Sequence, residues 1–292
     1  MTQPAEPRIH KTTRSFKAYE IEELADIYFF RPLGAFVARA AGALGMSPTA
    51  LTLVGAAIGV TAGLLLYDER LGLLAFALLI VHSVFDSADG QLARMTGRVT
   101  ELGRILDGVG GYMTHAAVYV AIVAGIISTS GRLSIIWLAL LCAIANTVHA
   151  QLYDYFRNSY ASVAIKGRVP HATSGAVHAS WARRLLHAYE RVQRRLIGSH
   201  AAVAAAIAAR SPGGIVSTSD RARYRACYYW PVRGWNFLGD NTRFYAIGFF
   251  AWIHHLEWFF LFVLLPMNAA LAALWMWQRR ADRRFLGSAV VG

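Results

Sequence analysis

Three aspartates, Asp86, Asp89 and Asp107, stand close together in a part of the chain that is otherwise largely apolar. Asp86 and Asp89 share one face of a helix, because positions three apart lie about 60° from each other around an α-helix. Asp107 follows in a second apolar segment, after a short turn that contains Gly97. Three carboxylates gathered at low dielectric repel one another, and the usual remedy is a hard divalent cation with oxygen ligands. The spacing therefore predicts that Asp86, Asp89 and Asp107 are metal ligands.

Small residues and one arginine accompany the aspartates. Gly90 and Ala93 share the face of the first two aspartates, and Gly103 shares the face of the third. These residues remove side-chain bulk and leave room for a ligand, while Arg94 offers a donor fork suited to a phosphate. Together the set indicates phosphoryl transfer with a diphosphate ligand and Mg²⁺. The alternative is that each aspartate only pairs with an arginine at a helix end.

The segments that must position these residues are long and apolar. Of the 292 residues, 56% are hydrophobic and 16% are charged, whereas soluble domains carry about 25% charged residues. Five uncharged runs stand out: 51–67, 71–85, 108–131, 133–153 and 258–278. A sixth, weaker run is 244–256, which needs residues from about Gly234 onward to reach the roughly 20 that a spanning helix requires. The sequence predicts an all-α, polytopic membrane protein with six transmembrane helices.

Basic residues alternate with these predicted spans. The segments 1–50, 90–107, 154–243 and 279–292 hold 27 of the 29 lysines and arginines, and only Arg70 and Arg132 fall in the short turns on the other side. The positive-inside rule then places the aspartates and both termini in the cytoplasm. We expect a multi-pass protein of a bacterial-type inner or plasma membrane. A basic nucleic-acid-binding protein would not alternate its charge with apolar runs, so no nucleic-acid partner is expected.

Five segments are expected along the chain: an N-terminal part (1–50), four spans with the aspartate motif (51–156), a basic cytoplasmic segment (157–235), two further spans (236–278) and a basic tail (279–292). In the first, residues 15–29 suit an interfacial amphipathic helix capped by Ser15, or equally an amphipathic helix packed on protein. A short helix over 32–45 follows. Ser47-Pro48 then begins the first span. In the third, a basic helix over 181–197 is expected to be solvated or to face anionic headgroups.

The spacing D-x2-D-G-x2-A-R-x8-G-x3-D resembles the signature of the CDP-alcohol phosphotransferase family. Seven positions match: Asp86, Asp89, Gly90, Ala93, Arg94, Gly103 and Asp107. The stretch SPTALT also resembles the S-P-N-x-L-T that opens the first span of many members. The resemblance implies transfer of a phospho-alcohol from a CDP-alcohol to a second alcohol, with release of CMP. It further implies that the aspartates hold one or two divalent metals, Mg²⁺ or Mn²⁺, and that Gly90, Ala93, Arg94 and Gly103 line the cytidine-diphosphate site.

The family pattern continues with a fourth aspartate, assigned as the base for the attacking hydroxyl, where this chain has Gly111. Asp107, His115 and His82 are the predicted catalytic residues, and the two histidines, each one helical turn deeper than the motif, are the candidate replacements for the missing base. Each is otherwise a hydrogen-bonded buried histidine. Alternatively, a bound metal lowers the hydroxyl pKa enough that little base is needed, or the chain is inactive. Arg157, at the inner end of the fourth span, is a candidate acceptor or phosphate contact, unless it only pairs with Asp154.

Two arrangements of substrates stay open. In the first, CDP-diacylglycerol donates to a polyol or its phosphate, such as inositol phosphate or glycerol phosphate; in the second, a soluble CDP-alcohol donates to a lipid hydroxyl of diacylglycerol or a ceramide. The many basic residues of 154–243 favour the first arrangement. Membrane lipids are partners in either case, and the resemblance implies a homodimer. A transporter or lipid-binding protein without chemistry is the alternative class, and it has no need of small residues at nucleotide-site spacing.

Overall fold

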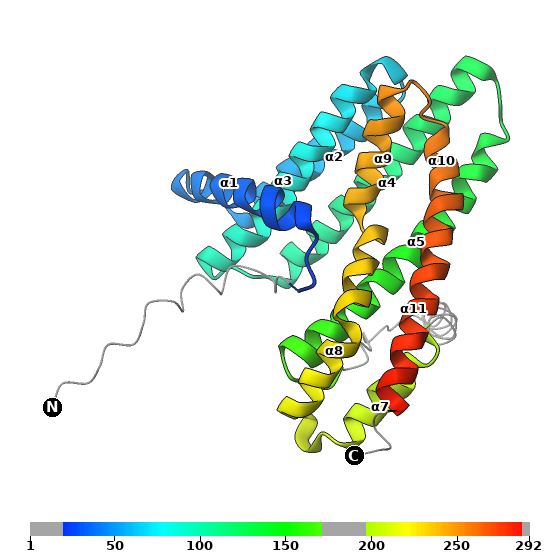
Figure 1. Cartoon of the computed structure of the whole chain (residues 1–292). Helices are drawn as coiled ribbons and strands as arrows, with labels where there is room; N and C mark the ends of the chain where they lie inside the picture. The colour runs from blue at the N-terminus through cyan, green and yellow to red at the C-terminus, as the bar shows by residue number, and fades with distance from the viewer. Residues whose placement is uncertain (1–19, 171–196, 288–292) are drawn as a thin grey trace, which may run out of the picture. The chain divides into compact units, whose positions relative to one another are not determined.

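The computed structural model describes residues 20–170 and 197–287, and within these ranges the regular elements are helices joined by short turns (Figure 1). The α-helices of the described residues are α1 (Arg31–Ala43), α2 (Pro48–Leu65), α3 (Gly72–Thr96), α4 (Glu101–Ser130), α5 (Ile135–Tyr160), α7 (His200–Ala209), α8 (Thr218–Trp235), α9 (Asp240–Trp252), α10 (Trp258–Phe262) and α11 (Asn268–Gly287). Nearly all of the basic helix expected over 181–197 lies outside the described ranges. The predicted all-α class is confirmed for the described part of the chain.

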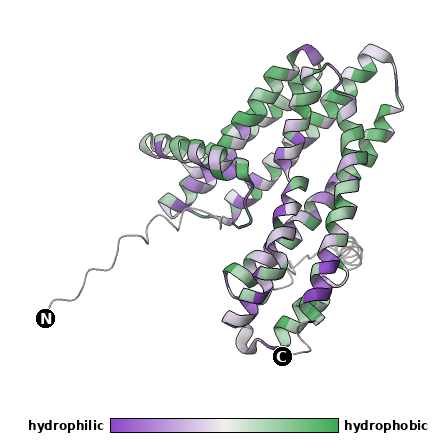
Figure 2. Ribbon diagram, in the orientation of Figure 1, coloured by the Kyte–Doolittle hydropathy of each residue, from purple (hydrophilic) through white to green (hydrophobic). Residues whose placement is uncertain are grey.

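Five helical segments are long and apolar enough to cross a membrane: Pro48–Leu65, Glu69–Thr96, Glu101–Ser130, Ile135–Ile165 and Trp258–Gly287. They cover nearly all of the five long apolar runs of the sequence. Within α11, apolar residues fill the first turns and hydrophilic residues the last ones (Figure 2). The chain is therefore a multi-pass membrane protein by the length and composition of its helices.

The weaker run over 244–256 lies mostly in α9, which is 13 residues long. Gly239 before it has an extended backbone (φ −74°, ψ 171°), so the helix begins at Asp240 and does not continue back to Gly234 as the sixth span requires. A helix of this length covers about 20 Å, less than the roughly 30 Å of a hydrocarbon core. The sixth span stays a prediction.

The chain divides into two compact units. The first contains the described residues of Met1–Cys142 together with Asp240–Phe262, and the second contains those of Ala143–Gly239 and Val263–Gly292. In the first unit α2, α3 and α4 pack side by side, α9 packs on α3, and α1 crosses α3 at a steep angle (Figure 1). All three predicted aspartates belong to this first unit.

The N-terminal helix differs from the two separate helices predicted. The chain is helical without a break from residue 24 to Ala43, and the π-helical turn Asp26–Phe30 leads directly into α1. Pro32, which has no N–H to donate, follows directly after this π-helical turn, where bonds from i to i−5 have replaced the usual i to i−4 pattern. Leu24 and Tyr28, two large apolar residues of the predicted amphipathic segment 15–29, are exposed. Ser15 lies outside the described residues, and the interfacial role stays a prediction.

The start of the first predicted span is confirmed in detail. Ser47 is the N-cap of α2, and its Oγ accepts a hydrogen bond from the backbone N–H of Ala50 at 3.1 Å. Further along α2, the lack of a side chain at Gly59 allows α3 and α4 to approach α2 closely. A Cβ at this position would lie only 2.8 Å from Nδ1 of His82 and would also collide with Thr114. The absence of a side chain at position 59 therefore fixes the spacing of three helices behind the aspartates.

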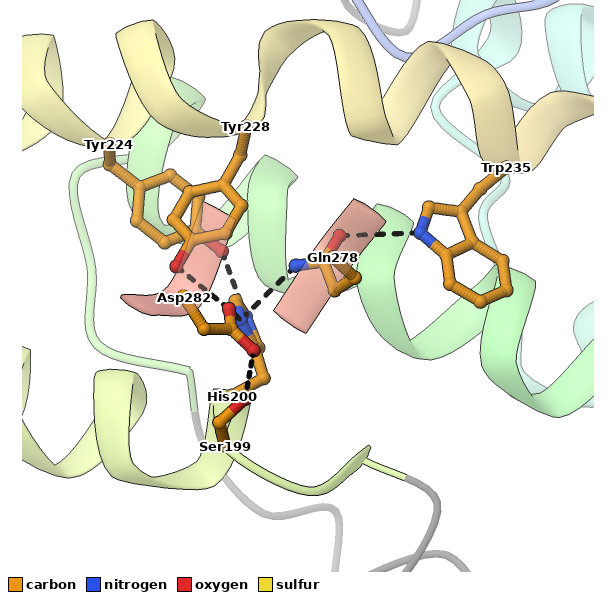
Figure 3. Close-up of polar contacts among 7 residues, drawn as sticks. All are labelled: Ser199, His200, Tyr224, Tyr228, Trp235, Gln278 and Asp282. Atoms are coloured by element: carbon orange, nitrogen blue, oxygen red, sulfur yellow. Dashed lines mark hydrogen bonds and ion pairs between the residues drawn. The ribbon is translucent and has the colours of Figure 1, made fainter. Parts of the chain in front are cut away.

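The core of the second unit holds a network of buried polar side chains on α7, α8 and α11 (Figure 3). Asp282, which is fully buried, accepts hydrogen bonds from Ser199 at 2.7 Å and Tyr228 at 2.8 Å, and it contacts Nδ1 of His200 at 2.8 Å. Tyr224 contacts the other ring nitrogen of His200 at 3.1 Å. Burial raises the pKa of Tyr228 far above its ordinary value, so its hydroxyl stays a donor. Contacts to the single carboxylate of Asp282 therefore connect α7, α8 and α11.

Candidate active site

One small cavity in the first unit collects all three aspartates of the sequence motif. It is lined by residues of α2, α3 and α4: Thr52, Gly55, Ala56, His82, Asp86, Asp89, Asp107, Gly110 and Gly111. Its free volume is about 10 Å³, which is room for about one water molecule. The turn after α3 contains Gly97 in the left-handed conformation (φ +69°), which lets α3 end and α4 begin nearby. Local chain geometry therefore brings carboxylates from two helices to one space.

The three carboxylates differ in exposure. Asp89 is buried (7% exposed), lies beside Thr52 and is within electrostatic reach of Asp107, whereas Asp86 and Asp107 are exposed. Within residues 20–170 and 197–287, no three Asp, Glu, His or Cys side chains stand ready to ligate one ion. The donor set itself fits a hard cation, because carboxylate oxygens are the ligands that Mg²⁺ and Mn²⁺ prefer. A cation would therefore have to draw side chains that already line one cavity somewhat closer together.

Arg94 lies beside the buried aspartate and folds back along its own helix. Its Nη1 is so close to Gly90 that a Cβ at position 90 would lie 3.3 Å away, so the glycine leaves space for the guanidinium. Arg94 is exposed and within electrostatic reach of Asp89 and of the buried ion pair between Arg31 and Glu22. The exposed guanidinium, within electrostatic reach of Asp89, is thus available for an anionic ligand.

The other two small residues of the motif have different surroundings. The backbone N–H of Gly103 donates to Oγ1 of Thr100 at 3.0 Å, and a Cβ at position 103 would press against the same oxygen. Gly103 therefore also has a local role in the N-terminal cap of α4. Ala93 is partly buried on α3. Arg104 pairs with Glu101 at 3.9 Å, so this arginine has a partner other than the aspartates of the motif.

The two predicted histidines both bond to backbone carbonyls through Nδ1. Nδ1 of His82 lies 2.9 Å from the oxygen of Gly55, and Nδ1 of His115 lies 2.9 Å from the oxygen of Gly111. Because a carbonyl oxygen only accepts, each Nδ1 must carry the proton. His82 lines the cavity and, when neutral, has Nε2 as its acceptor atom. The ring of Phe244 on α9 lies against both imidazoles, with centroid distances of 6.3 Å to His82 and 5.6 Å to His115.

Two charged residues of α9, Asp240 and Arg243, lie close to His115. Neither of them was predicted from the sequence as a site residue. Oδ1 of Asp240 lies 3.4 Å from Nε2 of His115 and 3.0 Å from Nη1 of Arg243. Asp240 is also within electrostatic reach of His82. The signal that could have found the pair is two opposite charges, three residues apart, just before the apolar run 244–256, since charges near a membrane core are often functional.

Arg157, the remaining predicted contact, belongs to the second unit. Its Nη1 donates to the hydroxyl of Tyr153, and its guanidinium lies over that ring at 5.3 Å from the centroid. In the same unit His149 contacts Asn268 at 3.2 Å through Nε2. Arg157 therefore has a partner within its own helix, and its proposed contact with the substrate stays a prediction.

Long apolar helices, three aspartates around one cavity and an exposed arginine within electrostatic reach of one of them define a membrane protein with a site suited to phosphate chemistry. Comparison with known proteins names the class more closely. The model of the family described as CDP-alcohol phosphatidyltransferase matches residues 46–208, more than half of the chain, so the chain belongs to this family. This match confirms the family resemblance drawn from residues 86–107.

A curated relative is the archaetidylinositol phosphate synthase of Pyrococcus horikoshii, which is 32% identical over 89 residues. These residues are 30% of this chain, and the chain spans 47% of the relative, about half of its length. The description of the family refers to transfer of a phosphatidyl group from a CDP-alcohol. Such enzymes generally use divalent metals.

Proposed function

We propose that this protein transfers a phosphatidyl-type group from CDP-diacylglycerol to the hydroxyl of a polyol or polyol phosphate, with release of CMP. The single observation that carries the proposal is the shared cavity of Asp86, Asp89 and Asp107, which lies inside the region matched by the family model. The name of the curated relative, which refers to an inositol phosphate lipid, favours a polyol phosphate as acceptor.

The three aspartates are the groups that would hold a divalent metal, Mg²⁺ or Mn²⁺. When bound, such an ion neutralises charge on the diphosphate and on the departing CMP. Arg94 binds a phosphate oxygen of the same ligand, and Gly90 keeps the guanidinium free to do so. Ala93 and Gly103 lie in the same motif, and their contact with the nucleotide is part of the proposal.

In the reaction the acceptor oxygen bonds to the phosphorus that carries the lipid alcohol. The bond from that phosphorus to the CMP oxygen breaks, and its electron pair leaves with CMP. The hydroxyl proton needs an acceptor. His82 offers Nε2 at the cavity wall, and His115 lies close to Gly111, so both stay candidates for that role.

The experiment is CMP release from purified protein in lipid nanodiscs, read by mass spectrometry. One arm supplies CDP-diacylglycerol with inositol phosphate, glycerol phosphate or inositol, and the other supplies soluble CDP-alcohols with diacylglycerol. We expect CMP and a new phospholipid only in the first arm. CMP in the second arm alone would show that the donor is a soluble CDP-alcohol and the acceptor a lipid. No CMP in either arm would contradict the transferase proposal and favour a lipid-binding or transport protein.

A further inference from the structure

The position where the family pattern has its fourth aspartate is open space in this protein. Gly111 lines the cavity, and a Cβ at this position would meet no atom of the described residues within 4 Å. Nothing that packs into this space explains the missing carboxylate. A group from another part of the chain has room to act there.

His115, one turn further along α4, cannot easily accept the proton of the attacking hydroxyl by itself. Its Nδ1 faces the carbonyl oxygen of Gly111, and its Nε2 faces a carboxylate oxygen of Asp240. Both partners are acceptors, so the ring satisfies both only when it carries both protons. A doubly protonated imidazole has no lone pair for a hydroxyl proton. The acidic partner on α9 is therefore a better candidate for the proton acceptor than His115.

Asp240 is held from two sides and still reaches outward. His115 and Arg243 both contact Oδ1, while Oδ2 takes no hydrogen bond from any residue of 20–170 and 197–287. The side chain is 62% exposed, although that of Arg243 is 2% exposed. Its place in the first turn of α9 explains the pair with Arg243, but a helix cap alone does not require the approach to His115.

We propose that Asp240 supplies the carboxylate that Gly111 lacks, accepting the proton of the attacking hydroxyl through Oδ2. His115 and Arg243 are positioning residues that hold the carboxylate and favour its ionised form. The inference rests on the proposed phosphatidyl transfer. In that step the acceptor oxygen bonds to phosphorus, the bond to CMP breaks, and the hydroxyl proton passes to Asp240 and then to solvent.

The test removes the carboxylate of Asp240 and then introduces a carboxylate at position 111, where the family pattern has its fourth aspartate. Asp240→Asn should lower kcat for CMP release by about 100-fold or more, the size expected for losing a general base. Mg²⁺-dependent affinity for CDP should change less than about twofold, since the base acts on the acceptor. Adding Gly111→Asp to Asp240→Asn should restore at least about tenfold of the lost kcat, because the hydroxyl regains a carboxylate within reach.

Gly108→Asp in the same Asp240→Asn background is the matched control. Position 108 also has open space around a Cβ, but it does not line the cavity, so an aspartate there should not restore kcat. Wild-type kcat in a folded Asp240→Asn variant, or equal recovery from both glycine replacements, would overturn the assignment. If Asp240→Asn does not fold, Asp240→Glu and Asp240→Gln are compared instead, and only the carboxylate should support turnover. No CMP release from the wild type would refute the proposed function itself, a result that is separate from these outcomes.

Discussion

His115 and Asp240 meet at 3.4 Å between Nε2 and Oδ1, and this contact joins α4, which carries Asp107, to α9. It matters because the other nitrogen of the same imidazole bonds to Gly111, which lines the aspartate cavity. A charged pair on α9 is thereby connected to the proposed site through one ring. The contact links α9, a segment with only a weak apolar signal, to the helix that carries Asp107.

Replacing Arg94 with lysine should weaken binding of the donor more than it slows the reaction. Lysine keeps the charge but loses the planar fork that holds a phosphate with two hydrogen bonds. We expect KM for the CDP-alcohol to rise about tenfold, equivalent to about 1.4 kcal/mol, with a smaller change in kcat. Steady-state kinetics of CMP release measure both. Arg98→Lys is the control, since Arg98 is exposed after the end of α3, and an equal rise in KM there would contradict a specific role for Arg94.

Gly59→Ala should destabilise the first unit. The new methyl group would lie 2.8 Å from Nδ1 of His82, which is itself held to Gly55, so the ring cannot move without losing a hydrogen bond. Overpacking of this kind costs about 1–3 kcal/mol, measured as a lower thermal unfolding temperature in detergent. Gly108→Ala is the control and should not lower that temperature, because its Cβ meets open space and alanine favours helix. Equal unfolding temperatures for the two variants would show that the helices are not tightly packed at position 59.

Tyr228→Phe should destabilise the second unit, because it removes the hydroxyl that donates to Asp282 at 2.8 Å. A hydrogen bond to a buried charged group contributes about 1.5–3 kcal/mol. Ser199 and His200 would remain as partners, so partial loss of stability is expected instead of unfolding. Thermal unfolding of Tyr229→Phe, the neighbouring and less buried tyrosine, provides the comparison. Equal stability of both variants would mean that the network in Figure 3 adds little.

The sequence predicts well the features that depend on neighbouring residues. The five long apolar runs are helices of spanning length, and Ser47 caps the first of them as its type and position indicate. Helical spacing also brings Asp86 and Asp89 to one cavity. The predicted break before α1 was wrong, because a π-helical turn carries the helix past Arg31.

Contacts between distant segments could not be derived in this way. Asp240 reaches His115 only through the packing of α9 against α3, for which the sequence has no periodic signal. Asp282 stands in an arginine-rich stretch that suggests a solvated tail, yet it is fully buried among tyrosines from α8. In both cases a charged residue beside an apolar run was the available clue, and the partner came from the tertiary structure.

The central claim is that three aspartates on two neighbouring helices hold a divalent ion that binds a cytidine diphosphate. Calorimetric titration of CDP into purified protein tests it most directly, with Mg²⁺ or with a chelator, for the wild type, Asp89→Asn and Asp107→Asn. We predict that the wild type binds CDP only when Mg²⁺ is present and that both variants lose this binding. Equal CDP affinity in the presence of chelator, or wild-type affinity in both variants, would contradict the claim.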